Sequence, residues 1–337
     1  MKHFLIILLL SCSTLLSAQT TAIPDANFEQ ALINQGYDSG PIDGLVLTAN
    51  INTIGTLWAG NYGITDLTGI EDFIALQNLW CADNLITNLD VTQNSALGYL
   101  NCANNMLASL DVTQNSLITD LRCNNNQLVS LDVSQNLMLK KLYCQDNQLT
   151  TINTNQNTLL ENLLVSKNPL GSLNLSQNTS LLQLLCDSIG ISTLDLSFNT
   201  LLTSLSCSKN QLISLDFSQN PLLYGLVCSF NQIISLNFSP QSGLASLTCS
   251  NNQLTCLNVK NGNNDSLFYF KAENNPNLTC IEVDNVTFSV SNWTDTISYI
   301  FDPASSFSTN CPSQCSVGIE ELPTTSISIY PNPTTGQ

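Results

Sequence analysis

The sequence predicts a repeat solenoid, in which stacked right-handed coils form a curved array of mostly short parallel β-strands and loops. The first observation is a phrase, clearest in residues 121–142, that matches itself when the sequence is shifted by 21 residues. Self-similarity at a fixed period of 20–50 residues is typical of solenoids. The second is a ladder of cysteines on the same period, in which Val165 fills the missing rung: Cys81, Cys102, Cys123, Cys144, Cys186, Cys207, Cys228 and Cys249.

Each coil carries two short alternating segments. Leu121-x-Cys123 opens the phrase and Leu131-x-Val133 follows it. An apolar–polar alternation of period two predicts a strand with one face inward. A single coil cannot bury that face by itself, so the coils must stack and stability grows with the number of neighbours.

Two columns of asparagine accompany these segments. Short amides donate and accept hydrogen bonds, so we expect them to satisfy backbone groups at the bends. Ile189 interrupts the first column, which predicts a looser bend there. The first column is Asn84, Asn105, Asn126, Asn147, Asn168, Asn210, Asn231 and Asn252, and the second is Asn94, Asn115, Asn136, Asn157, Asn178, Asn199 and Asn220.

The pattern Leu-x-x-Leu-x-Leu/Cys-x-x-Asn-x-Leu resembles the leucine-rich repeat family. The 21-residue period with cysteine at the strand position resembles the cysteine-ladder subtype of bacterial internalins, of the internalin J type. The resemblance covers residues 54–283, about ten or eleven coils. It implies a horseshoe-like coil and adhesion-like binding, although one fold hosts many functions.

Composition excludes several classes of function. The chain has 8 basic and 25 acidic side chains, a net charge of −17, which argues against nucleic acid or an anionic membrane as partner. Its one histidine, His3, lies in the N-terminal segment. The rest of the chain therefore lacks the base of a Ser-His-Asp or Cys-His site and any His-ligated metal. We expect no catalysis, no metal and no cofactor.

The ladder cysteines are predicted to be free. Parallel strands lie about 4.8 Å apart, slightly beyond the roughly 3.5–4.5 Å between Cβ atoms that a disulfide needs. Buried thiols of this kind act as small hydrophobes with a raised pKa. The alternative, a metal–thiolate stack, has no C-x-x-C pair to support it. Four cysteines outside the ladder suggest two disulfides with three open connectivities: Cys256, Cys280, Cys311 and Cys315.

Residues 1–18 read as a secretion signal, with Lys2 in front, an apolar run and a small-residue cleavage site ending at Ala18. The rival interpretation is a lipoprotein box that would lipidate Cys12. No later stretch is long enough to span a membrane.

Residues 19–53 are predicted to form an N-terminal cap. Helical spacing from Pro24 to Ile33 places Phe28 and Leu32 on one face, which would cover the open core of the first coil. The segment resembles the cap of many leucine-rich repeat proteins from Bacteroidota. Leu57 then begins an imperfect coil of 22 residues.

The C-terminal part breaks the period. Residues 284–315 form a predicted aromatic cap and residues 316–326 a linker. Residues 327–337 begin Ile-Ser-Ile-Tyr-Pro-Asn-Pro, which resembles the opening of the type A sorting domain of the type IX secretion system. That resemblance implies export by the type IX machinery, followed by release or anchoring at the cell surface. The aromatic residues of the cap are Phe288, Trp293, Tyr299, Phe301 and Phe307.

Outward strand positions are richest in chemistry in the first half of the array. Successive strands would carry Trp80, Tyr99, Arg122, Lys141 and Tyr143 on one face. Aromatic residues and arginine are the usual anchors of a binding surface. The alternative is sheet decoration, in which Asp120 pairs with Lys141 across strands and Arg122 stacks on Tyr143.

An acidic column offers a second candidate site. Calcium could bridge neighbouring carboxylates of this column, but the sequence pattern supplies no cage of six oxygens. The alternative is that the carboxylates are solvated and accept hydrogen bonds from nearby Ser, Thr and N–H groups. The column is Asp90, Asp111, Asp132, Asn153, Asn174, Asp195 and Asp216.

The sequence thus predicts a secreted or cell-surface protein that binds a protein or glycan ligand without catalysis. The alternative is a structural surface or matrix component that acts by self-association. An enzyme would need a catalytic domain beyond Gln337.

Overall fold

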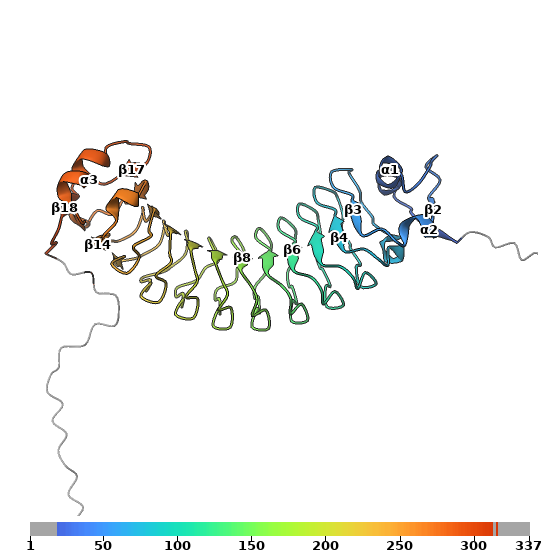
Figure 1. The fold of residues 1–337 in the computed structure, drawn as a ribbon, viewed down its shortest axis with the longest axis horizontal. Helices are drawn as coiled ribbons and strands as arrows, with labels where there is room; N and C mark the ends of the chain where they lie inside the picture. The colour runs from blue at the N-terminus through green and yellow to red at the C-terminus, as the bar shows by residue number, and fades with distance from the viewer. Residues whose placement is uncertain (1–18, 313–314, 316–337) are drawn as a thin grey trace, which may run out of the picture.

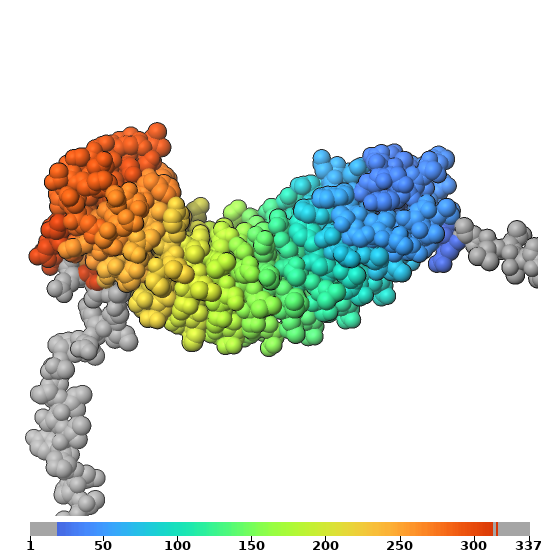
Figure 2. All heavy atoms as spheres, viewed as in Figure 1, coloured from blue at the N-terminus to red at the C-terminus, as the bar shows by residue number. Residues whose placement is uncertain are grey.

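The computed structural model describes residues 19–312 and residue 315. These residues form a curved rod of stacked coils with a cap at each end (Figure 1). Figure 2 shows that side chains fill the rod along its length and that both capped ends rise on the same side of the curve. The predicted solenoid of short parallel strands is confirmed.

The main sheet runs through the whole array and holds twelve parallel strands. Partner residues differ by 21 positions along most of the sheet and by 22 between the first two strands, where Leu57 lies opposite Leu79. The strands are β3 (Thr56–Trp58), β4 (Asn78–Trp80), β5 (Tyr99–Asn101), β6 (Asp120–Arg122), β7 (Lys141–Tyr143), β8 (Asn162–Leu164), β9 (Gln183–Leu185), β10 (Ser204–Ser206), β11 (Gly225–Val227), β13 (Ser246–Thr248), β15 (Tyr269–Lys271) and β17 (Tyr299–Ile300).

The register explains the core. The middle residue of each strand points inward, so Leu100 and Leu121 lie opposite each other and are fully buried. Eight of these strands are each followed by a ladder cysteine, and all eight are free thiols with no exposed surface. Burial raises their pKa, that of Cys102 to about 12.

A second sheet exists only at the C-terminal end. Its four parallel strands are β12 (Ser235–Asn237), β14 (Cys256–Asn258), β16 (Cys280–Glu282) and β18 (Ser306–Ser308). The prediction of a second strand in every coil is therefore wrong. Before β12, among the described residues, the corresponding segments are extended but unpaired, apart from one isolated bridge between Asp90 and Asp111.

The first asparagine column holds the bend after each strand. The Nδ2 group of Asn126 donates to the carbonyl oxygens of Cys102 and Cys123 at 3.0 and 3.1 Å, and its Oδ1 accepts from the N–H of Leu107 at 2.9 Å. The residue before each asparagine is left-handed, as at Asn125 with φ 53°. One amide thus satisfies backbone groups of two neighbouring coils.

At Ile189 the bonds of a column amide are absent, and the bend is rearranged: the N–H of Leu170 donates to the carbonyl oxygen of Asn168 instead. Gly171 and Gly190 take φ values of 68° and 81°, which only glycine adopts at little cost. The Oδ1 of Asn210 in the next coil then accepts from the N–H groups of Ile189, Gly190 and Ile191.

The N-terminal end is closed by helix α1 (Ala26–Asn34), as the sequence predicted. The carboxylate of Asp25 caps it by accepting from the N–H groups of Asn27 and Phe28. The ring of Phe28 packs against Phe73 at a centroid distance of 6.1 Å. The other elements of this end are the antiparallel pair β1 (Thr20–Ala22) and β2 (Leu45–Leu47), helix α2 (Thr48–Ile51) and the 3₁₀ helix η1 (Ile70–Asp72).

The C-terminal end is closed by an aromatic cluster and two disulfides. Trp293 is buried, and its ring lies 5.4 Å from those of Phe270 and Phe307. Of the three possible connectivities, the structure forms Cys256–Cys315 and Cys280–Cys311. The remaining elements are the 3₁₀ helix η2 (Asn264–Ser266) and helix α3 (Val286–Asn292).

The predicted signal at 1–18, with its rival lipidation site, lies outside the described residues, as do the linker at 316–326 and the sorting segment at 327–337. Within the part of the chain that the structure describes, no helix has the length and apolar character to cross a membrane.

Candidate functional site

The outward side chains of the main sheet form one continuous surface, here called the strand face. In each strand the first and third residues point outward, because the second is buried in the core. Trp80 on β4, Tyr99 on β5, Arg122 on β6, and Lys141 and Tyr143 on β7 therefore lie on four neighbouring strands of this face.

Aromatic rings stack on one another at the N-terminal end of the face. The Trp80 ring lies 4.7 Å from that of Trp58 and 4.2 Å from that of Tyr99. Sequence reasoning missed Trp58, because its coil has 22 residues and breaks the period. Aligning Leu57 with Leu79 would have placed Trp58 beside Trp80.

Arg122 extends this row across the next two strands. Its guanidinium carbon lies 5.5 Å from the ring centroid of Tyr99 and 4.8 Å from that of Tyr143. Its Nε and Nη2 atoms donate to the two carboxylate oxygens of Asp120, each at 3.0 Å. This hydrogen bonding raises the pKa of Arg122. The five side chains are hereafter the aromatic–arginine row: Trp58, Trp80, Tyr99, Arg122 and Tyr143.

The expected pairing of Asp120 with Lys141 is wrong, although the two residues lie opposite each other on β6 and β7. Asp120 bonds instead to Arg122, two residues along the same strand, whose planar guanidinium matches both carboxylate oxygens. The expected contact of Arg122 with Tyr143 is present. Lys141 forms no ion pair with any residue that the structure describes.

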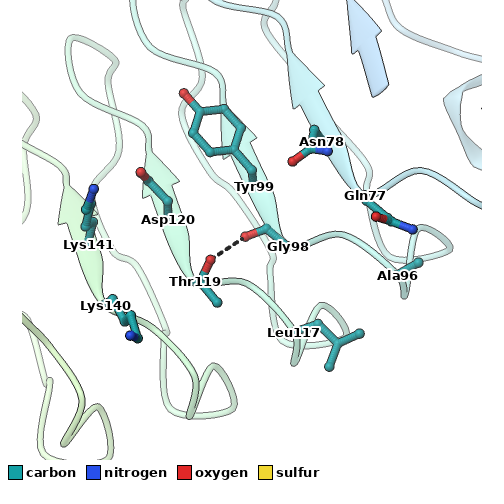
Figure 3. Close-up of a pocket in the computed structure, with 10 residues that line it drawn as sticks. All are labelled: Gln77, Asn78, Ala96, Gly98, Tyr99, Leu117, Thr119, Asp120, Lys140 and Lys141. Atoms are coloured by element: carbon teal, nitrogen blue, oxygen red, sulfur yellow. Dashed lines mark hydrogen bonds between the residues drawn. The ribbon is translucent and has the colours of Figure 1, made fainter. Parts of the chain in front are cut away.

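A hollow of about 660 Å³ lies beside the row. It opens where Gly98 brings no side chain, between Gln77 and Thr119 of the neighbouring coils. Figure 3 shows Tyr99, Asp120 and Lys141 side by side on successive strands, with Ala96 and Leu117 at the turns below. The hollow therefore has polar walls and an apolar rim.

The rim continues along the array as exposed apolar side chains in the turns before several strands. Since the residue that follows each of them is buried, these side chains point outward next to the strand face. In the first half they are Leu117, Met138 and Leu159, which are 40–54% exposed.

The second half of the strand face is different. Asn162 and Gln183 are hydrogen bonded to each other at 2.8 Å, and the hydroxyl of Ser206 donates to Asp187 at 2.7 Å. On β10, β11 and β13 the outward residues are small, neutral or both: Ser204, Gly225, Val227, Ser246 and Thr248. On β15 the Nζ of Lys271 lies 4.9 Å from the ring centroid of Tyr269. This half offers no aromatic row.

The carboxylates of the acidic column are already hydrogen bonded. The Oδ1 of Asp90 accepts from the hydroxyl of Thr92 at 2.7 Å and from its N–H at 2.9 Å, which lowers the pKa of Asp90. Asp132 and Asp195 bond to the second residue after them in the same way. Among the described residues, no group of three or more His, Cys, Asp or Glu side chains is arranged to hold a metal ion.

Comparison with known proteins defines the class. No protein-family model matches the chain, and no curated protein matches it. Solved structures do, and they show a leucine-rich repeat solenoid. Internalin C2 from Listeria monocytogenes is 24% identical, covering 63% of this chain and 98% of its own, with a TM-score of 0.57. A leucine-rich repeat protein from Leptospira interrogans is 20% identical, covering 71% and 74%, with a TM-score of 0.51.

The functional domain of internalin J from Listeria monocytogenes, which includes a cysteine ladder, is more similar in sequence. It is 30% identical, covers 86% of this chain and 72% of its own length, and superimposes with a TM-score of 0.65. The chain therefore belongs to the internalin J family of leucine-rich repeat proteins. Its architecture is that of a scaffold for protein interaction.

Proposed function

We propose that the protein is a secreted or cell-surface binding protein that recognises a protein or glycan ligand through the aromatic–arginine row, without catalysis. The observation that carries this proposal is the continuity of the row, in which ring and guanidinium contacts of 4.2–5.5 Å link five neighbouring strands. Trp, Tyr and Arg are the side chains that most often dominate binding energy.

The row is preorganised. Each strand fixes its own outward residue, and Arg122 is held by Asp120 on one side and by two tyrosine rings on the others. Side chains that are already ordered lose little rotamer entropy on binding, so more of the contact energy appears as affinity. Burial also raises the pKa of the Tyr99 hydroxyl above its ordinary value.

Export to the cell surface is part of the proposal. The signal-like segment at 1–18 and the sorting-like segment at 327–337 support passage through the type IX secretion machinery of a Bacteroidota cell, followed by release or anchoring. The two disulfides of the C-terminal cap support it independently, because disulfides persist in oxidising compartments outside the cytoplasm.

A non-catalytic role agrees with the inventory of side chains. No histidine occurs after His3, and the ladder thiols are buried with raised pKa values, so they are poor nucleophiles.

The test is binding of the purified protein to a combined array of glycans and cell-surface proteins. The variant Arg122→Ala/Tyr143→Ala should lose at least tenfold in affinity for a hit, since it removes two adjacent members of the row. The matched control Ser206→Ala/Val227→Ala changes the second half of the same face and should bind normally. Hits that survive the first variant would place the site elsewhere, and an array without hits would contradict a binding role.

A second candidate function, structural self-association, is favoured by one observation. The second half of the array carries exposed apolar side chains beside the strand face, where Leu201, Leu222, Tyr224 and Phe268 are 44–56% exposed. Sedimentation over a range of concentrations should then show assembly that Leu222→Ser weakens. A monomer at all concentrations would remove this candidate.

A further inference from the structure

We infer that the hollow beside the aromatic–arginine row receives an acidic side chain of a partner protein, whose carboxylate pairs with the ammonium group of Lys141. The inference rests on the proposed function and specifies the partner of the same surface. It follows from three features: which ring surfaces are free, which charges are unpaired, and the shape of the hollow.

The faces of the rings in the middle of the row are covered. Trp80 stacks between Trp58 and Tyr99, at 4.7 and 4.2 Å, so neither face of its indole is free. Tyr99 in turn has Trp80 and the guanidinium of Arg122 as neighbours. A sugar ring would need a free aromatic face to stack on, whereas packing against ring edges is ordinary in protein interfaces. The middle of the row, where Tyr99 borders the hollow, therefore favours a protein partner.

One cation of this region is without a partner. Arg122 is paired with Asp120 at 3.0 Å, and Lys140 with Glu161 at 3.4 Å. Lys141, which lines the hollow, has no carboxylate within ion-pair distance among the described residues. Because both oxygens of Asp120 are engaged by Arg122, Asp120 opposes an incoming carboxylate only weakly.

The surrounding charge sharpens this preference. The chain carries 25 acidic and 8 basic side chains, so an acidic group is repelled from most of its surface. Arg122, Lys140 and Lys141 lie on two neighbouring coils, and this cluster of cations lowers the cost of bringing a carboxylate to the hollow.

The hollow also fits a side chain with apolar neighbours. Asn78 and Thr119 offer hydrogen-bonding groups on its walls, while Ala96 and Leu117 form an apolar rim, and Leu117 is 54% exposed. An acidic side chain flanked by a large apolar one would satisfy Lys141 and cover Leu117 at the same time.

The experiment selects binders from a random 12-residue peptide library displayed on phage, with the full chain as bait. Enriched peptides should contain Asp or Glu next to Leu, Phe, Tyr or Trp. Their affinity should fall with added salt and drop at least tenfold with Lys141→Glu. The same variant, used as bait in a fresh selection, should enrich Lys and Arg instead, a reversal that a merely structural role of Lys141 would not produce.

A second variant fills the hollow without touching its charges. A Cβ atom on Gly98 would meet its nearest neighbours, carbonyl oxygens of Leu117 and Gln77, at 3.7 and 3.8 Å, which is ordinary contact. Gly98→Leu should therefore fold and lose at least tenfold in affinity for the selected peptides. The control Thr203→Leu introduces the same side chain at the equivalent position of another coil, where Leu182 already holds that position one coil earlier, and should bind normally.

The outcomes separate this inference from the proposed function. Peptides that depend on Arg122 and Tyr143 but show no acidic preference would keep the proposed function and overturn the inference. Hexuronate oligosaccharides that bind in a Lys141-dependent manner, with no enriched peptide, would overturn the choice of a protein partner. Absence of binding to peptides, glycans and surface proteins alike would contradict the proposed function itself.

Discussion

The two halves of the strand face share one frame and differ in what the frame displays. Asn126 in the first half and Asn231 in the second make the same pairs of bonds to carbonyl oxygens of two coils, at 3.0–3.1 Å. The ladder cysteines are fully buried in both halves. Outward, the first half carries the aromatic–arginine row, and strands β10, β11 and β13 of the second half carry serine, glycine, valine and threonine, followed by a single Tyr269–Lys271 contact on β15.

This difference teaches that frame and face are specified by separate positions. Along a strand, alternate residues point to opposite sides. The inward set holds the coil spacing and tolerates little change, since a void or a polar atom there is costly. The outward set contributes little to the frame, so chemistry can be concentrated on a few strands without altering the solenoid.

The largest expected effect tests whether the two halves share one core. At pH 8 a thiol with a pKa of about 12, such as that of Cys102, has about a thousandfold less thiolate than one at the ordinary value of 9.0. Burial raises the pKa of Cys207 in the second half as well. All eight ladder thiols should resist iodoacetamide in the native protein and react after denaturation, as read by mass spectrometry. Rapid native labelling confined to one half would break the comparison.

The next effect concerns the stability of each half. Cys123→Ser and Cys207→Ser should each lower the free energy of unfolding by about 1–3 kcal/mol, because a buried hydroxyl replaces an apolar thiol. Denaturant unfolding monitored by circular dichroism measures both. Cys123→Val is the control and should cost under about 1 kcal/mol, since Val165 already occupies one rung fully buried. A cost of only a few tenths for one serine variant would show that its half is packed loosely.

A smaller effect is expected at the left-handed residue of each bend. Phe230 holds this position in the second half with φ 58°, where the first half has Asn125 with φ 53°. Asparagine tolerates this conformation better than a bulky residue. Phe230→Asn should therefore raise the free energy of unfolding by roughly 0.5–1 kcal/mol, and Asn125→Phe should lower it. An unchanged midpoint in both variants would mean that the conformation costs little here.

The smallest expected effect is a pH dependence of folding stability that both halves share. The folded pKa values of Asp90, Asp132 and Asp195 lie below the ordinary value of 3.8, through bonds from the hydroxyl and N–H groups of the second residue after each. A lowered folded pKa stabilises the protein above the unfolded pKa, and this contribution is lost as pH falls through the folded values.

The thermal midpoint should therefore fall between pH 5 and pH 2, and a triple Asp→Asn variant should flatten that acidic limb slightly. Because these side chains are nearly fully exposed, solvent screens the effect and it should stay small. If the thermal midpoint of the triple variant fell more steeply with acid than that of the unmodified protein, these carboxylates would not stabilise the fold as stated.

The sequence alone determined the solenoid, the strand register, the inward ladder and the helix of the N-terminal cap. These features depend on the local alternation of apolar and polar residues and on a repeated period. Each copy of the repeat therefore predicts the same local geometry. The outward residues of β4 to β7 could likewise be predicted from the sequence. Because the middle leucine of each strand points inward, the residues on either side of it must point outward.

Only the tertiary structure decided which of these side chains meet. The pairing of Asp120 with Arg122 in place of Lys141 depends on side-chain reach and planar geometry. The sequence could place Trp58 beside Trp80, but only the folded side chains show that the two rings stack, at 4.7 Å. The disulfide connectivity and the second sheet, confined to the C-terminal coils, are long-range contacts. The 21-residue period repeats the same local pattern in every coil. It therefore does not indicate which residues of distant coils will come into contact.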